Sequence, residues 1–183
     1  MKIFWIVATF SWPLSASAEL VFVDYSGAVD SIMGAPQQYH VGDRISGQLV
    51  IDTALAPPNT SVFPPVFGVY GDRSVTSADF VRGFNPAAEE SNDSVSVRNG
   101  ASFDAYRVTD WRNGGDSYSG LILNVGTTRS LLRNVDIIQN FEMTPVDEPT
   151  TFAGLLLWGK GVVQRSVSFA LDRFKVTPGH CRP

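Results

Sequence analysis

The chain has 183 residues, which suffices for one domain with a hydrophobic core and is too short to indicate two. Hydrophobic residues make up 44% of the sequence and charged residues 17%, a balance that predicts a folded protein and excludes a disordered one. The net charge of −4, with arginines scattered along the chain, excludes the basic surface that a nucleic-acid-binding protein needs.

The first 18 residues have the pattern of a signal peptide. A positive start, Met1-Lys2, precedes an apolar run over residues 3–10 that is too short to span a bilayer as a stable helix. Pro13 then interrupts the helix, and the Ala-Ser-Ala of residues 16–18 supplies the small side chains that a signal peptidase accepts. The sequence predicts a protein that is exported to the periplasm or secreted, with no transmembrane anchor after cleavage. The alternative is a retained N-terminal strand.

Most of the mature chain has the pattern of short strands separated by turns. Residues 44–52 alternate apolar and polar side chains, which predicts a strand with Leu49 and Ile51 on its buried face. Residues 163–176 alternate in the same way but change phase near Asp172, which predicts a β-bulge. Other segments rich in β-branched and aromatic residues predict further strands, namely 20–32, 75–84, 94–98, 103–111 and 118–125.

Turn residues separate these segments, and Asn99-Gly100 is the strongest hairpin signal among them. The Pro-rich segment 54–71 is interpreted as an irregular connector, and 128–140 fits either a helix or a strand. We therefore predict an all-β fold, an antiparallel two-sheet β-sandwich of jelly-roll or immunoglobulin-like type with at most one short helix. The single domain is expected over residues 19–178, with 179–183 as a flexible C-terminal tail.

Two segments resemble a known family. Residues 41–53, VGDRISGQLVIDT, resemble the "VGDxVSGxFxYDT" strand of exported bacterial PEP-CTERM-type proteins, and residues 114–119, GGDSYS, resemble their "GxDxYS" hairpin. The last strand, up to residues 176–178, is similar to the one that precedes their sorting tail. The resemblance implies an exported bacterial β-sandwich protein, often from bacteria that make exopolysaccharide. The family's Pro-Glu-Pro motif, membrane helix and Arg cluster do not follow in residues 179–183, so tail-directed sorting is not implied.

The sequence contains no evident catalytic constellation. His40 and His180 lack the neighbouring ligands of a zinc site, and neither a nucleophile elbow nor a phosphate-binding loop is found. Adjacent acidic residues such as Glu89-Glu90 are typical of solvated loops rather than of the separated carboxylate pair of a glycosidase. The sequence therefore predicts a protein that is not an enzyme.

Residues 110–118 carry two candidate binding groups. Asp110, Asn113 and Asp116 offer hard oxygen ligands for a calcium ion, although the same residue types also suit an unliganded hairpin turn. Trp111 and Tyr118 offer aromatic faces that pack against the C–H groups of a pyranose ring, and the alternative for them is packing in the core.

Cys181 is the only cysteine, so it cannot form an internal disulfide. An exposed thiol in the tail of an exported protein predicts an intermolecular bond, either a disulfide-linked dimer or a mixed disulfide, and the alternative is an idle reduced thiol.

These features together predict an exported, non-enzymatic structural or interaction protein of the bacterial cell envelope or extracellular matrix. Its expected partner is an extracellular polysaccharide or another envelope protein. The alternative is a calcium-supported carbohydrate-binding module, and no cofactor besides calcium is indicated.

Export predicts a defined mature N-terminus. Cleavage is expected between Ala18 and Glu19, because Ala16 and Ala18 place small side chains at the positions that the peptidase recognises. Intact-mass measurement and N-terminal sequencing of the exported protein test this site. A mature chain that begins at any residue other than Glu19 contradicts it.

Overall fold

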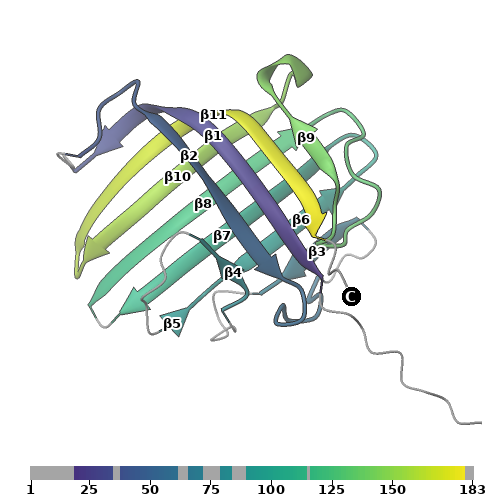
Figure 1. Ribbon diagram of the computed structural model, residues 1–183, viewed down its shortest axis with the longest axis horizontal. Coiled ribbons are helices and arrows are strands. Elements are labelled where there is room, and N and C mark those ends of the chain that lie inside the picture. The colour runs from purple at the N-terminus through teal and green to yellow at the C-terminus, as the bar shows by residue number, and fades with distance from the viewer. Residues whose placement is uncertain are drawn as a thin grey trace, which may run out of the picture.

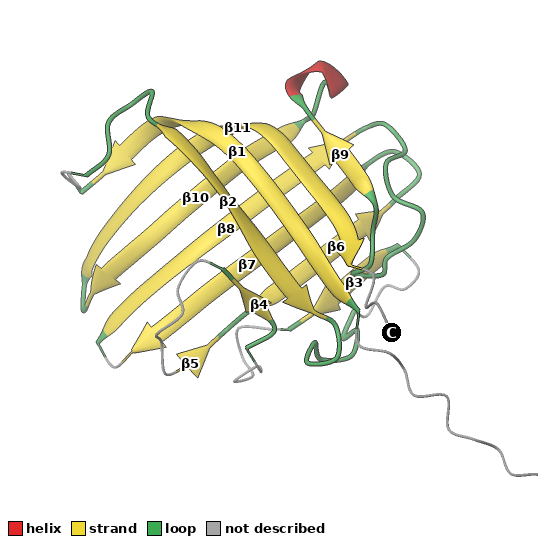
Figure 2. Cartoon of the chain, in the orientation of Figure 1, coloured by secondary structure: helices red, strands yellow, loops and turns green. Residues whose placement is uncertain are grey.

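The computed structural model describes residues 19–34, 38–61, 66–71, 79–83, 90–114 and 116–179. Strands account for 63% of these residues, and the helical structure among them is the single 3-10 turn η1 (Pro145–Asp147), as Figure 2 shows. The strands are β1 (Leu20–Met33), β2 (Arg44–Asp52), β3 (Phe67–Tyr70), β4 (Val81–Arg82), β5 (Glu90–Ser91), β6 (Ser94–Asn99), β7 (Asp104–Gly114), β8 (Ser117–Thr127), β9 (Phe141–Met143), β10 (Thr151–Lys160) and β11 (Val163–Gly179). The prediction of an antiparallel, nearly all-β protein is confirmed.

All the strands in the described ranges belong to one 11-stranded sheet. The order of its main path is β3-β6-β7-β8-β10-β11-β1-β2-β4, with β5 beside β7 and β9 beside β11. The sheet curls into a half-barrel, in which β1, β2 and the end of β11 cross in front of β6, β7, β8 and β10 (Figure 1). Two separate sheets, as a sandwich requires, are not confirmed, because β11 and β1 continue the hydrogen-bonded ladder from one layer to the other.

Two β-bulges lie where β1 and β11 bend. Ser26 pairs with Arg173 and Gly27 with Leu171, so Asp172 is an extra residue, which confirms the bulge predicted from the phase change. The Asp172 carboxylate accepts a hydrogen bond from Ser26 and forms an ion pair with Arg44, and these contacts hold its pKa below the usual value. Bulges increase local twist, so these positions allow one ladder to turn over the core.

The second bulge mirrors the first on the opposite strand. Val29 pairs with Phe169 and Ser31 with Ser168, which leaves Asp30 as the extra residue of β1. The Ser168 hydroxyl donates a hydrogen bond to the Asp30 carboxylate over 2.7 Å. Each bulged position therefore carries an aspartate whose carboxylate accepts a hydrogen bond from a serine of the paired strand.

The core lies between the two layers of the half-barrel. Tyr106 of β7 is fully buried, and its ring contacts Phe141 of β9 and Phe174 of β11, with centroids 5.7 and 6.3 Å away. The Tyr106 hydroxyl donates to the Ile137 carbonyl over 2.9 Å, and burial raises the pKa of Tyr106. Leu49 is also fully buried in this core, on the face predicted for its strand.

Residues 128–140 form neither a helix nor a strand and cover one end of the core. The Asp104 carboxylate accepts hydrogen bonds from the backbone N–H groups of Leu131 and Leu132, over 2.6 and 2.8 Å. Tyr70 donates its hydroxyl proton to the Val135 carbonyl over 3.0 Å. These contacts replace the regular hydrogen bonding that the segment lacks.

The buried face of β2 predicts the effect of a charge there. Leu49→Asp places an unpaired carboxylate in the core, so the free energy of unfolding should fall by roughly 3–5 kcal/mol. Urea denaturation of Glu19–Pro183 measures this change. Ser46→Asp, which adds the same charge on the exposed face of the same strand, is the control and should cost less than about 1 kcal/mol. Equal losses for the two variants would contradict the assigned face.

Candidate functional site

Trp111 of β7 and Tyr118 of β8 lie together on the outer face of the sheet. The residues of β7 that alternate with Trp111, including Val108, Asp110 and Arg112, are buried on the inner side or in the sheet. The Trp111 and Tyr118 rings are nearly parallel, at 8°, with centroids 5.6 Å apart. Both side chains are half-buried, so each keeps part of its surface open to solvent.

Two local features fix the position of the Trp111 ring. Its indole N–H donates to the Asn113 side-chain oxygen over 3.0 Å. Gly120 of β8 pairs with Trp111, and a Cβ at Gly120 would lie 2.3 Å from the indole ring, so only glycine allows the ring to rest there. A fixed aromatic surface of this kind is suited to contact with the apolar face of a sugar ring, because little side-chain entropy is lost on binding.

The three predicted calcium ligands have different surroundings. Asp110 is fully buried, and its carboxylate lies 3.1 Å from the guanidinium of Arg112. Asn113 uses its side-chain oxygen for Trp111, and Asp116 is exposed in the turn between β7 and β8. Asp110 and Asn113 are three residues apart in one strand, so their side chains leave opposite faces of the sheet. In the part of the chain that the structure describes, no group of three His, Cys, Asp or Glu side chains is placed to hold a metal ion.

A buried charge cluster that the sequence analysis did not predict lies beside this site. Arg112 is only 4% exposed, and its guanidinium donates to the Asp79 carboxylate over 2.8 Å and to the Val81 carbonyl over 2.9 Å. Burial alone would lower the pKa of Arg112, but the bond to Asp79 and the nearby carboxylates of Asp110 and Asp93 outweigh it and raise the pKa. The signal in the sequence is Asp110-x-Arg112, which puts opposite charges on one face of a strand.

Asp93 anchors the same region through the backbone. It is fully buried, and one of its carboxylate oxygens accepts hydrogen bonds from the N–H groups of Phe80 and Val81, over 3.0 and 2.8 Å. Its other oxygen accepts from the Trp111 N–H over 3.4 Å. Together with Arg112, this carboxylate fastens the short strand β4 and the residue before it to β7.

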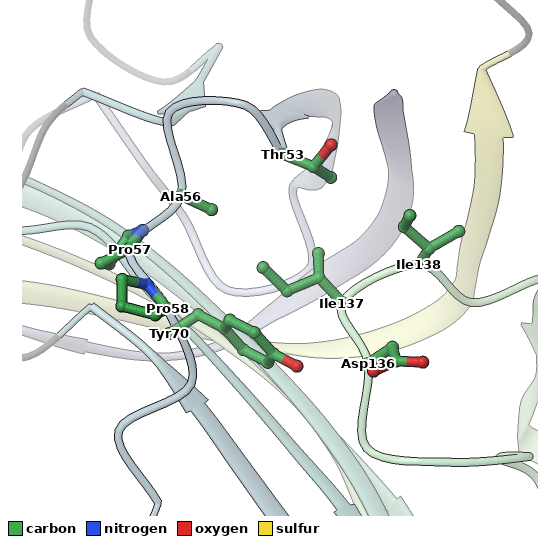
Figure 3. A pocket seen from close by; sticks show the side chains of 8 residues that line it. All are labelled: Thr53, Ala56, Pro57, Pro58, Tyr70, Asp136, Ile137 and Ile138. Carbon is green, nitrogen blue, oxygen red and sulfur yellow. The ribbon is translucent and has the colours of Figure 1, made fainter. Parts of the chain in front are cut away.

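A hollow of about 310 Å³ lies between three parts of the chain: the residues that follow β2, strand β3, and segment 128–140. Its lining is mostly apolar and consists of Thr53, Ala56, Pro57, Pro58, Tyr70, Asp136, Ile137 and Ile138. Figure 3 shows Ile137 in the middle of this set, with the two prolines on one side and Asp136 and Ile138 on the other. Burial first, and then Asp136, raise the pKa of Tyr70.

A second hollow, here named the rim hollow, has a volume of about 430 Å³ and lies at the β10–β11 hairpin. Trp158, Gly159, Lys160 and Arg165 line it. The hairpin tip is joined to the neighbouring β7–β8 tip, because the Gly161 N–H donates to the Asp116 carbonyl over 2.8 Å. The aromatic pair and the rim hollow therefore lie on adjoining hairpins.

Cys181 and the predicted signal peptide lie outside the described residues, so the disulfide and the cleavage site stay predictions. Gly179 belongs to β11 and pairs with Leu20, one residue beyond the expected end of the domain.

Comparison with known proteins gives no relative: no protein-family model, no curated protein and no solved structure matches this chain. Among the described residues, no helix has the length and apolar character that crossing a membrane requires.

The buried charge cluster predicts a large effect of removing its cation. Arg112→Met leaves the Asp110 carboxylate buried beside an apolar side chain, so the free energy of unfolding should fall by about 3–5 kcal/mol. Urea denaturation measures the loss, and the double variant Asp110→Asn/Arg112→Met should recover part of it. Arg44→Met removes a pair with Asp172 that is open to solvent, and this control should cost less than about 1 kcal/mol. An Arg112→Met variant no less stable than the control would refute the cluster's role.

Proposed function

We propose that this chain is an exported, non-enzymatic interaction protein of the bacterial cell envelope or extracellular matrix, and that it contacts carbohydrate through Trp111 and Tyr118. The observation that carries the proposal is the nearly parallel pair of half-buried rings on the outer face of the sheet. The large aromatic residues Tyr106 and Phe174 are fully buried, whereas this pair is held at the surface. Aromatic rings at a surface are a common means of binding the C–H face of a pyranose.

Two further features fit the proposal. Glu19, the first residue of the expected mature chain, is joined to the fold, because its backbone N–H donates to the Thr53 hydroxyl over 3.1 Å. The buried carboxylates of Asp93 and Asp104 accept backbone hydrogen bonds, and that of Asp110 lies against Arg112, so each has a structural role. A calcium-supported form has less support, since Asp110 faces the inner side of the sheet.

The test is a screen of residues 19–183 on a glycan array, with calcium and with a chelator. Binding to one class of polysaccharide is expected, and Trp111→Ala and Tyr118→Ala should each weaken it by about tenfold, equivalent to about 1.4 kcal/mol. Ile122→Ala removes apolar surface from the same strand and face without removing an aromatic ring, so it is the matched control and should bind normally.

Melting temperatures of all variants show whether the fold is intact before the affinities are compared. Absence of binding to every glycan, or equal affinities of the Trp111→Ala variant and the parent, would contradict the proposed carbohydrate contact. If glycan binding is lost when a chelator removes calcium, calcium is required for the proposed function.

A further inference from the structure

The rim hollow combines one aromatic ring with two cations on the inner face of the sheet. Trp158 and Arg165 are directly opposite each other in the β10–β11 ladder. Lys160 is two residues beyond Trp158 on the same strand, so its side chain leaves the same face. The volume of about 430 Å³ falls within the range of roughly 300–1,000 Å³ that small-molecule sites occupy.

Neighbouring residues restrict the positions of the Trp158 ring and of the alkyl chain of Arg165. The Tyr39 ring, from the connection between β1 and β2, contacts the Trp158 ring with centroids 6.0 Å apart at 49°. Gly34 has a left-handed φ of 79°, and a Cβ there would lie 3.0 Å from Cγ of Arg165. Glycine therefore lets the end of β1 lie against the alkyl part of Arg165, which restricts where its charged end can reach.

The two cations differ from several others in the described part of the chain, which are paired with carboxylates. Arg44, Arg112, Arg129, Arg173 and Lys175 each have a carboxylate oxygen within 4.0 Å. Lys160 and Arg165 have no carboxylate within that distance among the described residues. Two like charges beside one ring, with no carboxylate of the described residues within 4.0 Å of either, are complementary to an anionic ligand.

We propose that the rim hollow binds a carboxylated pyranose unit of an acidic polysaccharide. The inference rests on the proposed carbohydrate contact and adds a second site, on the inner face of the sheet, with a defined ligand class. Trp158 packs against the apolar C–H face of the ring, the guanidinium of Arg165 forms a charged hydrogen-bonded pair with the carboxylate, and Lys160 adds a second positive charge. A neutral sugar would use the ring alone and would leave both cations unpaired.

A single-stranded nucleic acid is the other ligand class that aromatic rings and cations recognise. The chain as a whole disfavours it, because its net charge is −4 and phosphate-backbone binding needs a basic surface along many nucleotides. A polyuronate, in contrast, offers a carboxylate on every sugar ring, and one such unit meets both the cations and Trp158.

Titration calorimetry with alginate oligosaccharides in chelator tests the inference, with the carboxyl-reduced form of the same oligosaccharides as the neutral probe. The protein should bind the acidic form at least about tenfold more tightly than the reduced form. The double variant Lys160→Gln/Arg165→Gln should lose this preference and keep its affinity for the reduced form. Arg133→Gln removes one exposed charge from segment 128–140 and should leave the preference unchanged.

The outcomes separate the inference from the proposed function. A retained preference in Lys160→Gln/Arg165→Gln, an equal loss in Arg133→Gln, or displacement of alginate by single-stranded DNA at equal concentration would overturn the rim hollow as an acidic-sugar site. Trp158→Ala should weaken the binding of both the acidic and the reduced oligosaccharides. An unchanged affinity in that variant overturns the stacking role of Trp158. If the parent protein binds neither form nor any glycan on the array, the proposed function itself fails.

Discussion

The fold depends on the sharp bend of a single hydrogen-bonded ladder. A sheet can bury its inner face against itself only if some strands turn over the rest, and β1 and β11 make that turn together. Asp30 and Asp172 each add one residue at the bend, and Gly27 removes a side chain where a Cβ would lie 2.2 Å from the Ala170 carbonyl oxygen. Without these features the long strands would continue straight, and the core around Tyr106 and Phe174 would lose one of its two layers.

An open half-barrel leaves its irregular segments without a ladder, and buried aspartates take over that role. Asp93 binds the backbone at Phe80 and Val81, and Asp104 binds the backbone at Leu131 and Leu132. A carboxylate that accepts several backbone hydrogen bonds offsets much of its desolvation cost, so these side chains can remain in the core. For Asp110, the residue predicted as a metal ligand from the sequence, the ion pair with the Arg112 guanidinium offsets the cost of burial in place of backbone hydrogen bonds.

Local periodicity predicted those strands whose two faces differ, and it located the bulge at Asp172 from the change of phase. It did not predict β10, because Leu156 and Leu157 are both buried although they face opposite sides, and because Gly154 interrupts the apolar run. Gly154 is required there, since a Cβ would lie 2.0 Å from the Phe169 ring. The closure of the ladder through β11 and the path of segment 128–140 depend on partners distant in sequence, which no local pattern encodes. The same holds for the rim hollow, where Gly34 and Tyr39 approach Arg165 and Trp158 from another hairpin.

The link between the two hairpin tips has a consequence for ligands longer than one sugar. Trp111 lies over Gly120, and Trp158 pairs with Ser119, the adjacent residue of β8, so the two tryptophans flank one point of the sheet from its outer and inner sides. The Gly161 to Asp116 hydrogen bond keeps the spacing of the two tips constant. A polymer that passes over this edge would meet both aromatic groups in succession, and the second contact would form at a high effective concentration. If the proposed carbohydrate contacts hold, the number of linked sugars, as well as their chemistry, would determine how long the protein stays bound to such a polymer.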